Sequence, residues 1–348
     1  MYTREILPPR ASPVENGNPV FGTWSSAFEK VDLLEIQGFY RFPLPRWARG
    51  YLIKESQCFN VQNDHFILDA AFYDFKLYRM VRIFVFDVKN NEKFFYKVIK
   101  PLSLWRLPNS LQNASVDSNH GDFYFRIHDW FDAGSVKLDI NIEASRRRPA
   151  LNVHLSCDIS RNISPMAVLM GMAARRSVYA YKTLALAEGE IAVGQRRVKV
   201  TRENFSSFFR DYKGYYPGRA RTTVCSAAGF DEKNRRFGFH IAENQTRDTN
   251  KSNENALWVD GKLTPLPPVI VTTTRGQDNS WVIQDVEGMV DLTFKTREQI
   301  KSGMRFFITG TEITTAPGYY NGTLVSADGA EIQVKNLFGI GEKIDFRV

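Results

Sequence analysis

Residues 136–158 read VKLDINIEASRRRPALNVHLSCD, and both ends of this stretch alternate apolar with polar side chains. The segments from Val136 to Glu143 and from Leu151 to Asp158 each have the period of two that is typical of half-buried strands. Between them, Ser145-Arg-Arg-Arg-Pro149 is suited to a hairpin connection. The stretch therefore predicts an antiparallel strand pair with one face in a core.

The same signal recurs along the chain. Residues 123–128 and 237–241 alternate in the same way, and the apolar run 80–88 predicts a strand covered on both faces. Two Asp-Gly pairs, at 260–261 and 328–329, lie between such runs, where a hairpin turn requires a positive φ. Helical signal is limited to 165–175, with Ser164 as its N-cap, and to 204–209.

These patterns predict an all-β protein with antiparallel strands and little helix. The length of 348 residues favours two domains. We expect an N-terminal extension over 1–20, an N-terminal β-domain over 21–165, a linker with a short helix over 166–178, and a C-terminal β-domain over 179–348. Each β-domain has enough strands for a sandwich or a barrel.

Composition excludes several classes of protein. With 43% hydrophobic, 24% charged and 13% aromatic residues, the chain is neither disordered nor fibrous. No apolar run approaches the roughly 20 residues of an integral membrane segment, and residues 1–10 show no signal-peptide core. The three cysteines, Cys58, Cys157 and Cys225, are too few and too widely spaced for a disulfide framework. A cytoplasmic location is therefore expected.

A net charge of +8 raises the question of a nucleic-acid partner. The basic clusters at 146–148, 175–176, 196–197 and 235–236 are dispersed and lie near predicted turns. We therefore expect no nucleic-acid binding, and the sequence does not indicate an oligomeric state. Phosphate loops, dinucleotide fingerprints and nucleophile elbows are absent, and the five histidines are not closely spaced. Neither a cofactor nor a metal ion is expected.

Polar side chains are concentrated between Asp211 and Val269. The segments DYKGYYP (211–217), GFHIAENQ (238–245) and NENALW (253–258) combine amides, carboxylates and aromatic rings. Asn, Asp and Glu side chains can stabilise irregular loops by bonding backbone groups. They can also converge on a cavity and orient a ligand there. Both interpretations remain open at this point.

Several blocks in this region resemble a domain family of unknown function, DUF2804. The strongest block runs from Asn244-Gln245 through Asn253-Glu254-Asn255 and Trp258 to Leu266-Pro267-Pro268. Further matching blocks are Tyr181-Lys182 with Glu188-Gly189, Asp211 with 213–217, Trp281 with 285–294, and 339–342. Together they cover the chain strongly from about Tyr179 onward and loosely before it.

The resemblance implies a fold and a type of ligand. DUF2804 is distantly similar to two-domain calycin proteins such as carotenoid hydratase and tocopherol cyclase, which pair lipocalin-like β-domains around an apolar ligand. The expected fold is therefore two antiparallel lipocalin-like β-barrel or sandwich domains. The expected partner is an apolar small molecule, lipid-like or isoprenoid-like.

On this basis the first hypothesis is a cofactor-free protein that binds such a molecule or transforms it by hydration, cyclisation or isomerisation. The candidate catalytic acids or bases are Asp211, Glu243 and Glu254. Candidate ligand-binding residues are Tyr212, Tyr215, His240, Asn244, Asn255 and Trp258.

The alternative is a non-catalytic binding or interaction protein whose polar motifs are structural loop staples. A third hypothesis is a glycan-binding sandwich that would use exposed Trp47, Trp105 and Trp130.

Overall fold

The computed structural model describes residues 2–38, 44–101, 107–159, 163–173, 175–273, 279–306 and 309–347, and for residues 305, 306 and 309 it describes the backbone. The protein is nearly all-β, with 62% of its residues in strands and 3% in helices. Two curled antiparallel half-barrel sheets form the fold, as two lipocalin-like domains would. The predicted fold class is confirmed.

The first sheet contains thirteen strands in the described residues, and its main path runs β7-β6-β5-β4-β15-β13-β11-β10-β9-β8. β3 and β12 extend one side of this path, and β14 pairs with β13. Its strands are β3 (Gly22–Trp24), β4 (Ile53–Gln62), β5 (Phe66–Asp74), β6 (Tyr78–Asp87), β7 (Glu92–Pro101), β8 (Ala114–His120), β9 (Phe123–Trp130), β10 (Ser135–Ile142), β11 (Leu151–Asp158), β12 (Met166–Gly171), β13 (Ser177–Val193), β14 (Arg196–Val200) and β15 (Ser206–Tyr215).

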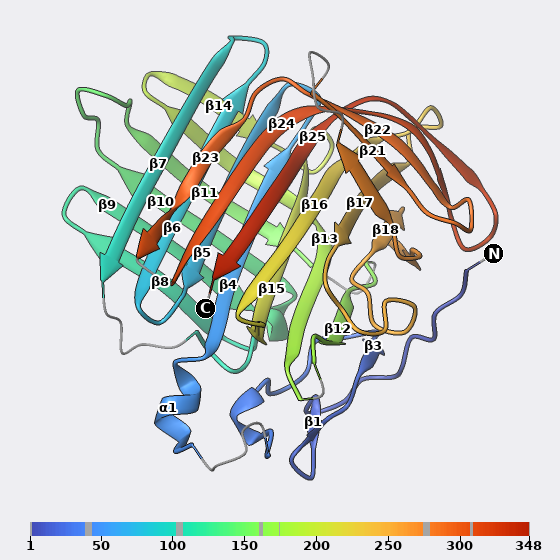
Figure 1. The fold of residues 1–348 in the computed structure, drawn as a ribbon. Coiled ribbons are helices and arrows are strands. Elements are labelled where there is room, and N and C mark those ends of the chain that lie inside the picture. Colours follow the sequence, from blue (N-terminus) through green and yellow to red (C-terminus); the bar gives the residue numbers. More distant parts are fainter. Residues whose placement is uncertain are drawn as a thin grey trace.

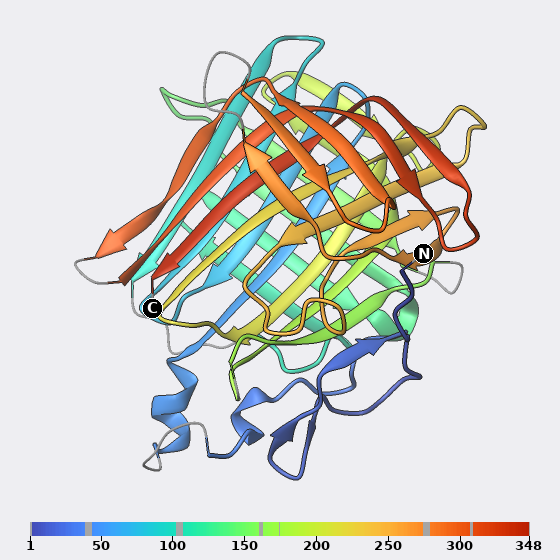
Figure 2. The same cartoon turned by 45° about the vertical axis from the view of Figure 1, so that its right-hand side comes forward.

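The second sheet contains ten strands among the described residues, in the order β19-β18-β17-β16-β25-β24-β22-β21-β20, with β23 paired to β24. Figure 2 shows the long strands β24 and β25 running side by side next to β16. The strands are β16 (Arg219–Phe230), β17 (Arg236–Glu243), β18 (Ala256–Val259), β19 (Lys262–Pro265), β20 (Ile270–Thr273), β21 (Ser280–Gln284), β22 (Val290–Thr296), β23 (Ile300–Phe306), β24 (Thr309–Val325) and β25 (Glu331–Arg347).

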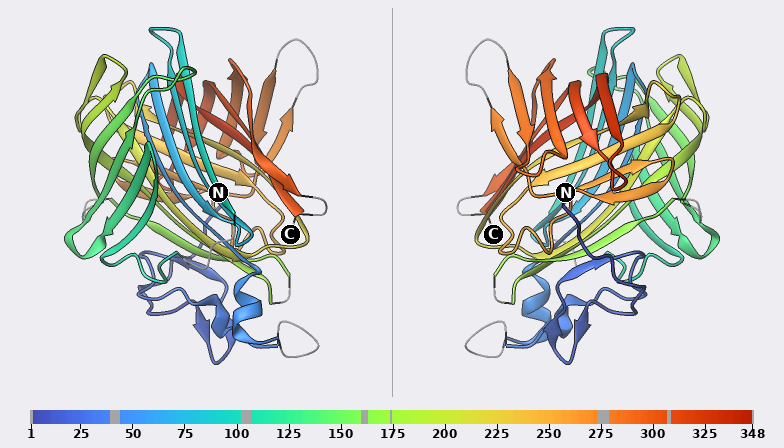
Figure 3. Two further views of the ribbon diagram at one scale, coloured as in Figure 1. Left: turned by 90° about the vertical axis from the view of Figure 1, so that its left-hand side faces the viewer. Right: turned by 90° about the vertical axis from the view of Figure 1, so that its right-hand side faces the viewer.

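The N-terminal segment lies at one end of both sheets (Figure 3). It contains the small hairpin β1 (Val14–Glu15) and β2 (Asn18–Pro19), a 3-10 turn at Leu33–Glu35, and the helix α1 (Arg46–Gly50). A second 3-10 turn, Phe131–Ala133, connects β9 and β10. Within the described ranges, no helix has both the length and the apolar character needed to cross a membrane.

The stretch 136–158 forms the predicted hairpin of β10 and β11, with Ile142 opposite Leu151. Its apolar positions point into the core of the first sheet, and Val136, Leu138 and Ile140 are fully buried. Predicted strands at 123–128, 237–241 and 80–88 are also confirmed as β9, β17 and β6. β6 is covered on both faces, because alternate residues contact the core of the first sheet or strands of the second.

Both Asp-Gly hairpins are confirmed. Asp260 and Gly261 have φ values of 47° and 80°, as a type I′ turn requires, and they join β18 to β19. The second hairpin joins β24 to β25 through residues 326–330, so its turn is longer than the two-residue turn at 260–261. Only Gly329 has a positive φ there, among the residues of that turn.

Both predicted helices are wrong. Residues 166–171 form β12, which pairs with β3 and β13 and is buried along its whole length. A short apolar run has no polar face, so its period cannot distinguish a buried strand from a buried helix. Residues 204–209 form the end of a turn and then the start of β15. The division into domains stays a prediction. The chain passes from the first sheet to the second between Tyr215 and Arg219.

The two sheets pack against each other. One face of β15 lies in the core of the first sheet, and its other face contacts the second sheet. Phe209 and Tyr215 point into the core of the first sheet, whereas Phe208 packs on Trp258 from the second sheet. Even-numbered residues of β15 therefore face the second sheet, and odd-numbered residues face the interior of the first. Gln62 of β4 joins the sheets by donating to the carbonyls of Ala228 and Phe338.

Candidate functional site

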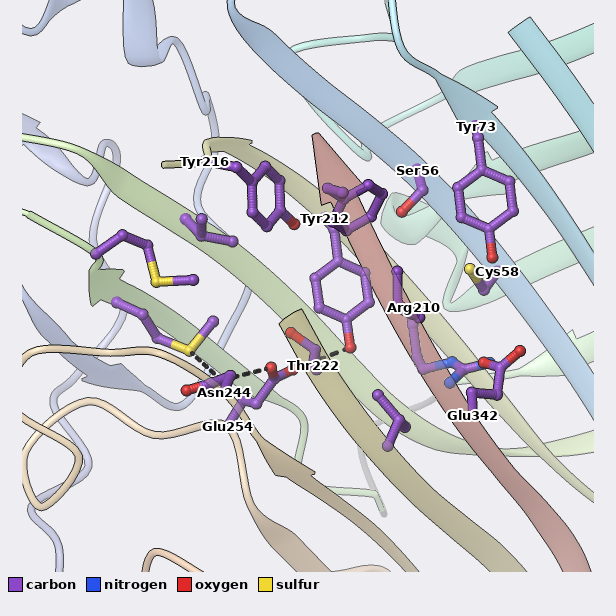
Figure 4. A pocket seen from close by; sticks show the side chains of 16 residues that line it. Ser56, Cys58, Tyr73, Arg210, Tyr212, Tyr216, Thr222, Asn244, Glu254 and Glu342 are labelled. Atoms are coloured by element: carbon purple, nitrogen blue, oxygen red, sulfur yellow. Dashed lines mark hydrogen bonds between the residues drawn. The ribbon is translucent and has the colours of Figure 1, made fainter. Parts of the chain in front are cut away.

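A cavity lies between the two sheets, and β4, β5, β12, β13 and β15 of the first sheet meet β16 and β25 of the second around it (Figure 4). Its volume is about 60 Å³. Most of its wall is apolar and comes from Met170, Met172, Val178, Val224, Ile344, Phe346 and the rings of Tyr73 and Tyr216. Its polar groups are those of Ser56, Cys58, Arg210, Tyr212, Thr222, Asn244, Glu254 and Glu342.

The carboxylate of Glu254 is the most extensively bonded group in this wall. Its Oε1 accepts from Asn244 Nδ2 at 2.9 Å, and its Oε2 accepts from the Tyr212 hydroxyl at 3.0 Å (Figure 4). Lys182 Nζ lies 2.5 Å from Oε2, on the side away from the cavity. Asn244 also contacts Met170 Sδ at 3.5 Å. A buried carboxylate is therefore held in one orientation at the polar end of an apolar cavity.

Charged and polar neighbours set the protonation state of this group. Burial alone would raise the pKa of Glu254, but Lys182 and the bonds from Asn244 and Tyr212 hold it below its ordinary value. Burial and the Glu254 charge keep the pKa of Tyr212 well above its ordinary value. At neutral pH the pair therefore consists of an ionised carboxylate and a neutral hydroxyl.

Behind Glu254, a buried imidazole lies between two cations. His240 Nδ1 is 2.6 Å from Lys182 Nζ, and Nε2 is 3.2 Å from Arg210 Nη1. Burial and these two cations lower the pKa of His240 well below its ordinary value, so the ring is neutral. Burial lowers the pKa of Lys182 to about 8, although Glu254 opposes this shift. Lys182 can therefore exchange a proton close to neutral pH. A neutral imidazole has one donor and one acceptor nitrogen, so His240 can accept from Lys182 or from Arg210 but not from both, and it can donate only to Lys182 in its uncharged form.

Arg210 connects this group to a buried ion cluster that joins the sheets. Its Nη2 donates to Asp69 Oδ1 at 3.3 Å, and Asp69 Oδ2 accepts from Arg82 at 2.8 Å. Arg82 also bonds Glu342 of β25 at 2.7 Å, and Glu342 accepts from Thr315 at 2.9 Å. Both cations and both carboxylates are paired, as buried charges require.

The loop that carries Glu254 is fixed on both sides. Asn255 accepts from the Ala242 amide at 2.7 Å and donates to the Pro267 carbonyl at 2.8 Å. Arg4, from the N-terminal segment, donates to the carbonyls of Asn253 and Asn255 at 2.7 and 3.2 Å. These bonds hold the backbone around Glu254 independently of any ligand.

Four of the residues predicted from the sequence meet at this site. Glu254, Tyr212 and Asn244 line the cavity, and His240 lies directly behind them. They come from β15, from β17 and the segment after it, and from the residue two before β18, so they are far apart in sequence and adjacent only in the fold.

Three predicted residues lie elsewhere. Asp211 and Tyr215 occupy odd positions of β15 and are buried inside the first sheet. Glu243 follows Ile241 on the face of β17 that points into the second sheet, opposite to the face of His240. The three candidate carboxyl groups are therefore separated into three environments, and only Glu254 borders the cavity.

Asn255 and Trp258 have structural environments. Asn255 is fully buried and both ends of its amide bond backbone groups, which is the staple arrangement. Trp258 is fully buried against Phe208, and its indole N–H donates to the Ser164 carbonyl at 2.8 Å. Neither of the two lines the cavity between the sheets.

Sequence reasoning missed Lys182 and Arg210 as site residues. Lys182 belongs to a block that resembles the family, and it is the one charged residue in the run YAYKTLALA (179–187). Arg210 similarly interrupts the apolar start of β15. A charge in the middle of a buried strand needs a partner, so both residues carried a usable signal. The wall residue Met170 was missed because its segment was predicted to be helical.

The arrangement can take a proton from a bound molecule, return it, and bond a polar group on that molecule. A metal-binding role finds no support in the described ranges, where no three His, Cys, Asp or Glu side chains come together as metal ligands. Cys58 borders the cavity, but burial raises the pKa of its thiol to about 11, so it is a weak nucleophile.

A solved structure with the same fold is known. A crystal structure of kievitone hydratase from Nectria haematococca matches 84% of this chain and 88% of its own, with a TM-score of 0.52 and 11% sequence identity. An AttH-like protein from Nitrosomonas europaea matches 89% of this chain and 98% of its own, with a TM-score of 0.46 and 10% identity. No curated protein matches the sequence.

A family model covers nearly the whole chain. Residues 14–347 match the family described as Domain of unknown function (DUF2804), which is nearly the whole chain. The chain belongs to this family, and the resemblance stated from its motifs is confirmed.

Proposed function

We propose that this DUF2804 protein binds an apolar small molecule in the cavity between its sheets and performs acid–base chemistry on it without a redox cofactor. The observation that carries the proposal is Glu254, an ionised carboxylate held by Lys182, Asn244 and Tyr212 at the polar end of an apolar cavity. Ligand sites combine apolar walls with a few convergent polar groups in this way.

Hydration, cyclisation and isomerisation all require that one proton be moved between two positions. Glu254 can serve as the base that takes this proton and as the acid that returns it. In an addition of water to a polarised double bond, Glu254 would take the proton of the attacking water and then deliver it to the neighbouring carbon. Tyr212 and Asn244 hold the carboxylate in position during both steps.

Hydration is the reaction to test first. A solved structure that shares the fold carries the name of a hydratase, and this supports the choice although the sequences are only 11% identical. A lipid-like or isoprenoid-like ligand is proposed because Met170, Met172, Val224 and Ile344 form much of the wall. The cavity of about 60 Å³ is smaller than such a ligand, so binding requires that flexible wall side chains such as Met170 and Met172 move aside.

We further propose a cytoplasmic protein without a nucleic-acid partner. The absence of a nucleic-acid partner is supported by ion pairs, because several arginines of the basic clusters are paired with nearby carboxylates. Arg196 pairs with Asp87 and Glu92, Arg197 with Glu190, and Arg235 with Asp231.

The test begins with native mass spectrometry of the gently purified protein, followed by solvent extraction. We expect a stoichiometric apolar adduct in the wild type and its loss from Val224→Phe, which fills the cavity. Val271→Phe, a similar change on β20 outside the cavity wall, is expected to retain the adduct. A clean mass for the wild type, or an adduct retained by Val224→Phe, contradicts the proposed binding site.

Catalysis is tested separately on the identified molecule. Glu254→Gln should bind it and fail to turn it over, with a loss of about 10²-fold or more in kcat, since a general base typically contributes this much. Tyr212→Phe removes one bond to the carboxylate and should lower kcat by a smaller factor. Unchanged turnover in Glu254→Gln contradicts the acid–base role.

A non-catalytic binding protein is the second candidate function. Asn253 and Asn255 favour it, because their side chains bond backbone groups. Asn253 bonds within its own loop, and Asn255 joins that loop to Ala242 of β17 and to Pro267. An adduct that is bound but never altered by the wild type would select this candidate.

A further inference from the structure

A second hollow opens where the start of β4 and the β5–β6 turn meet the ends of β24 and β25. Its volume is about 210 Å³, and its wall includes Lys54, Phe75, Leu77, Phe346 and Arg347. We call it the edge cleft. It is distinct from the cavity between the sheets, but the Phe346 ring borders both.

Two cations border the edge cleft. Lys54 Nζ donates to the carbonyls of Tyr51 and Phe75 at 3.0 Å each, which leaves one of its three N–H groups for another partner. Arg347 is exposed. Within the described ranges, no carboxylate lines the cleft, and no ion pair joins either cation to an acid. The cleft therefore has positive charge without a matching anion.

The rest of the wall is apolar and partly open to solvent. Leu77 and Tyr51 expose 43% and 41% of their surface, although side chains of this kind are usually more buried. The Phe75 and Phe346 rings lie 5.7 Å apart, and Phe346 in turn lies 5.1 Å from Tyr216 of the cavity between the sheets. An apolar path leads from Leu77 to Phe346.

We propose that the edge cleft binds a single-chain anionic amphiphile, with its carboxylate at Lys54 and Arg347 and its hydrocarbon chain along Leu77 and Phe75 toward Phe346. The charge complementarity selects the head group, and the apolar wall selects the chain. This site does not depend on the acid–base reaction proposed above, because none of its polar residues belongs to the Glu254 group.

The electrostatics of Lys54 agree with this assignment. Burial lowers the pKa of Lys54 to about 8, and the charge of Lys76 adds to this shift while Asp74 opposes it. A bound carboxylate would favour the charged amine and raise that pKa again. The free protein thus has a cation that an anionic ligand would stabilise.

The test is calorimetric titration of the full chain with monomeric dodecanoate and, separately, with dodecanol. We expect dodecanoate to bind and dodecanol to bind at least about tenfold more weakly, because dodecanol cannot form the charge-assisted hydrogen bond to Lys54. Lys54→Met should lower the affinity for dodecanoate by a similar factor, whereas Lys54→Arg should keep most of the wild-type affinity. Lys199→Met, on the exposed edge strand β14, should bind like the wild type.

Val224→Phe separates this proposal from the proposed function. It should bind dodecanoate normally, since Val224 borders only the cavity between the sheets. If Val224→Phe abolishes binding and Lys54→Met does not, the ligand lies in that cavity, and the edge-cleft proposal is overturned while the cavity is supported. Equal binding of dodecanol overturns the proposal as well. So does sedimentation of the protein with phosphatidylglycerol vesicles that depends on Lys54, since the cleft would then contact a membrane surface.

Discussion

Glu254 and Asp211 are both buried carboxyl groups in the polar region of the sequence, yet the fold gives them opposite properties. Glu254 borders the cavity between the sheets, and Lys182, Asn244 and Tyr212 hold its pKa below the ordinary value. Asp211 lies inside the first sheet, where burial raises its pKa to about 7 despite Lys213 nearby. At neutral pH one group is an anion beside a cavity, and the other is about half-protonated in a core.

Burial therefore does not determine the protonation state of a carboxyl group by itself. Both groups are desolvated, and desolvation favours the neutral acid in each case. Glu254 remains charged because a cation and two donors are in contact with its oxygens. A second buried carboxyl group, that of Asp129, lies near Asp211. It accepts a hydrogen bond from Gln57, and its pKa is also raised well above its ordinary value. Of the two groups, Glu254 is the one that stays ionised and borders a cavity.

Removing the cation from the Glu254 site should have the largest effect. Lys182→Met leaves a buried carboxylate without its charge partner, and breaking such a pair costs about 3–5 kcal/mol. Urea unfolding at pH 7 measures this loss. The depressed pKa of Glu254 stabilises the wild type above the ordinary carboxyl pKa, so the gap between wild type and variant should narrow as the pH falls below about 4.

The double variant Lys182→Met/Glu254→Gln is the control for this comparison. With both charges removed, it should regain much of the lost stability. If the double variant is as unstable as Lys182→Met, the cost comes from lost packing of the lysine chain, and the charge argument fails.

Asp211→Asn should change the pH dependence of stability in the opposite sense. Between about pH 4 and 7 the folded wild type keeps a proton that the unfolded chain releases, so its stability falls as the pH rises through this window. At about 1.36 kcal/mol per pKa unit, the fall amounts to at most about 4 kcal/mol. The Asn variant lacks this fall, which unfolding curves at pH 4, 6 and 8 would reveal. Parallel pH profiles for the two proteins would refute the raised pKa.

Asn255→Ala should have a smaller and purely structural effect. It leaves the Ala242 amide and the Pro267 carbonyl without their partner, at a cost of about 1–3 kcal/mol and a few degrees in Tm. The adduct expected in the cavity should remain. Asn321→Ala, at an exposed position in the second sheet, should change Tm much less. Loss of the adduct without loss of stability would assign Asn255 to the site instead of the loop.

Local sequence patterns were enough to predict the class of secondary structure and the family. Alternation of Val136, Leu138 and Ile140 with polar neighbours specifies a strand with one buried face, because side chains of a strand point alternately to its two sides. The block around Asn253-Glu254-Asn255, taken together with those at 213–217, 285–294 and 339–342, indicated the family, and the family match over residues 14–347 confirms it. Local patterns are enough for such conclusions because they depend only on neighbours along the chain.

The tertiary structure alone decided which polar residues meet. Tyr212 and Asp211 are adjacent in sequence, but the alternation of β15 places Tyr212 at the cavity and Asp211 in the core of the first sheet. Lys182 acquires its role from the packing of β13 against the loop of Glu254. The alternation of side chains along a strand identifies its two faces from local sequence. Only the packing of the sheets determines what each face contacts.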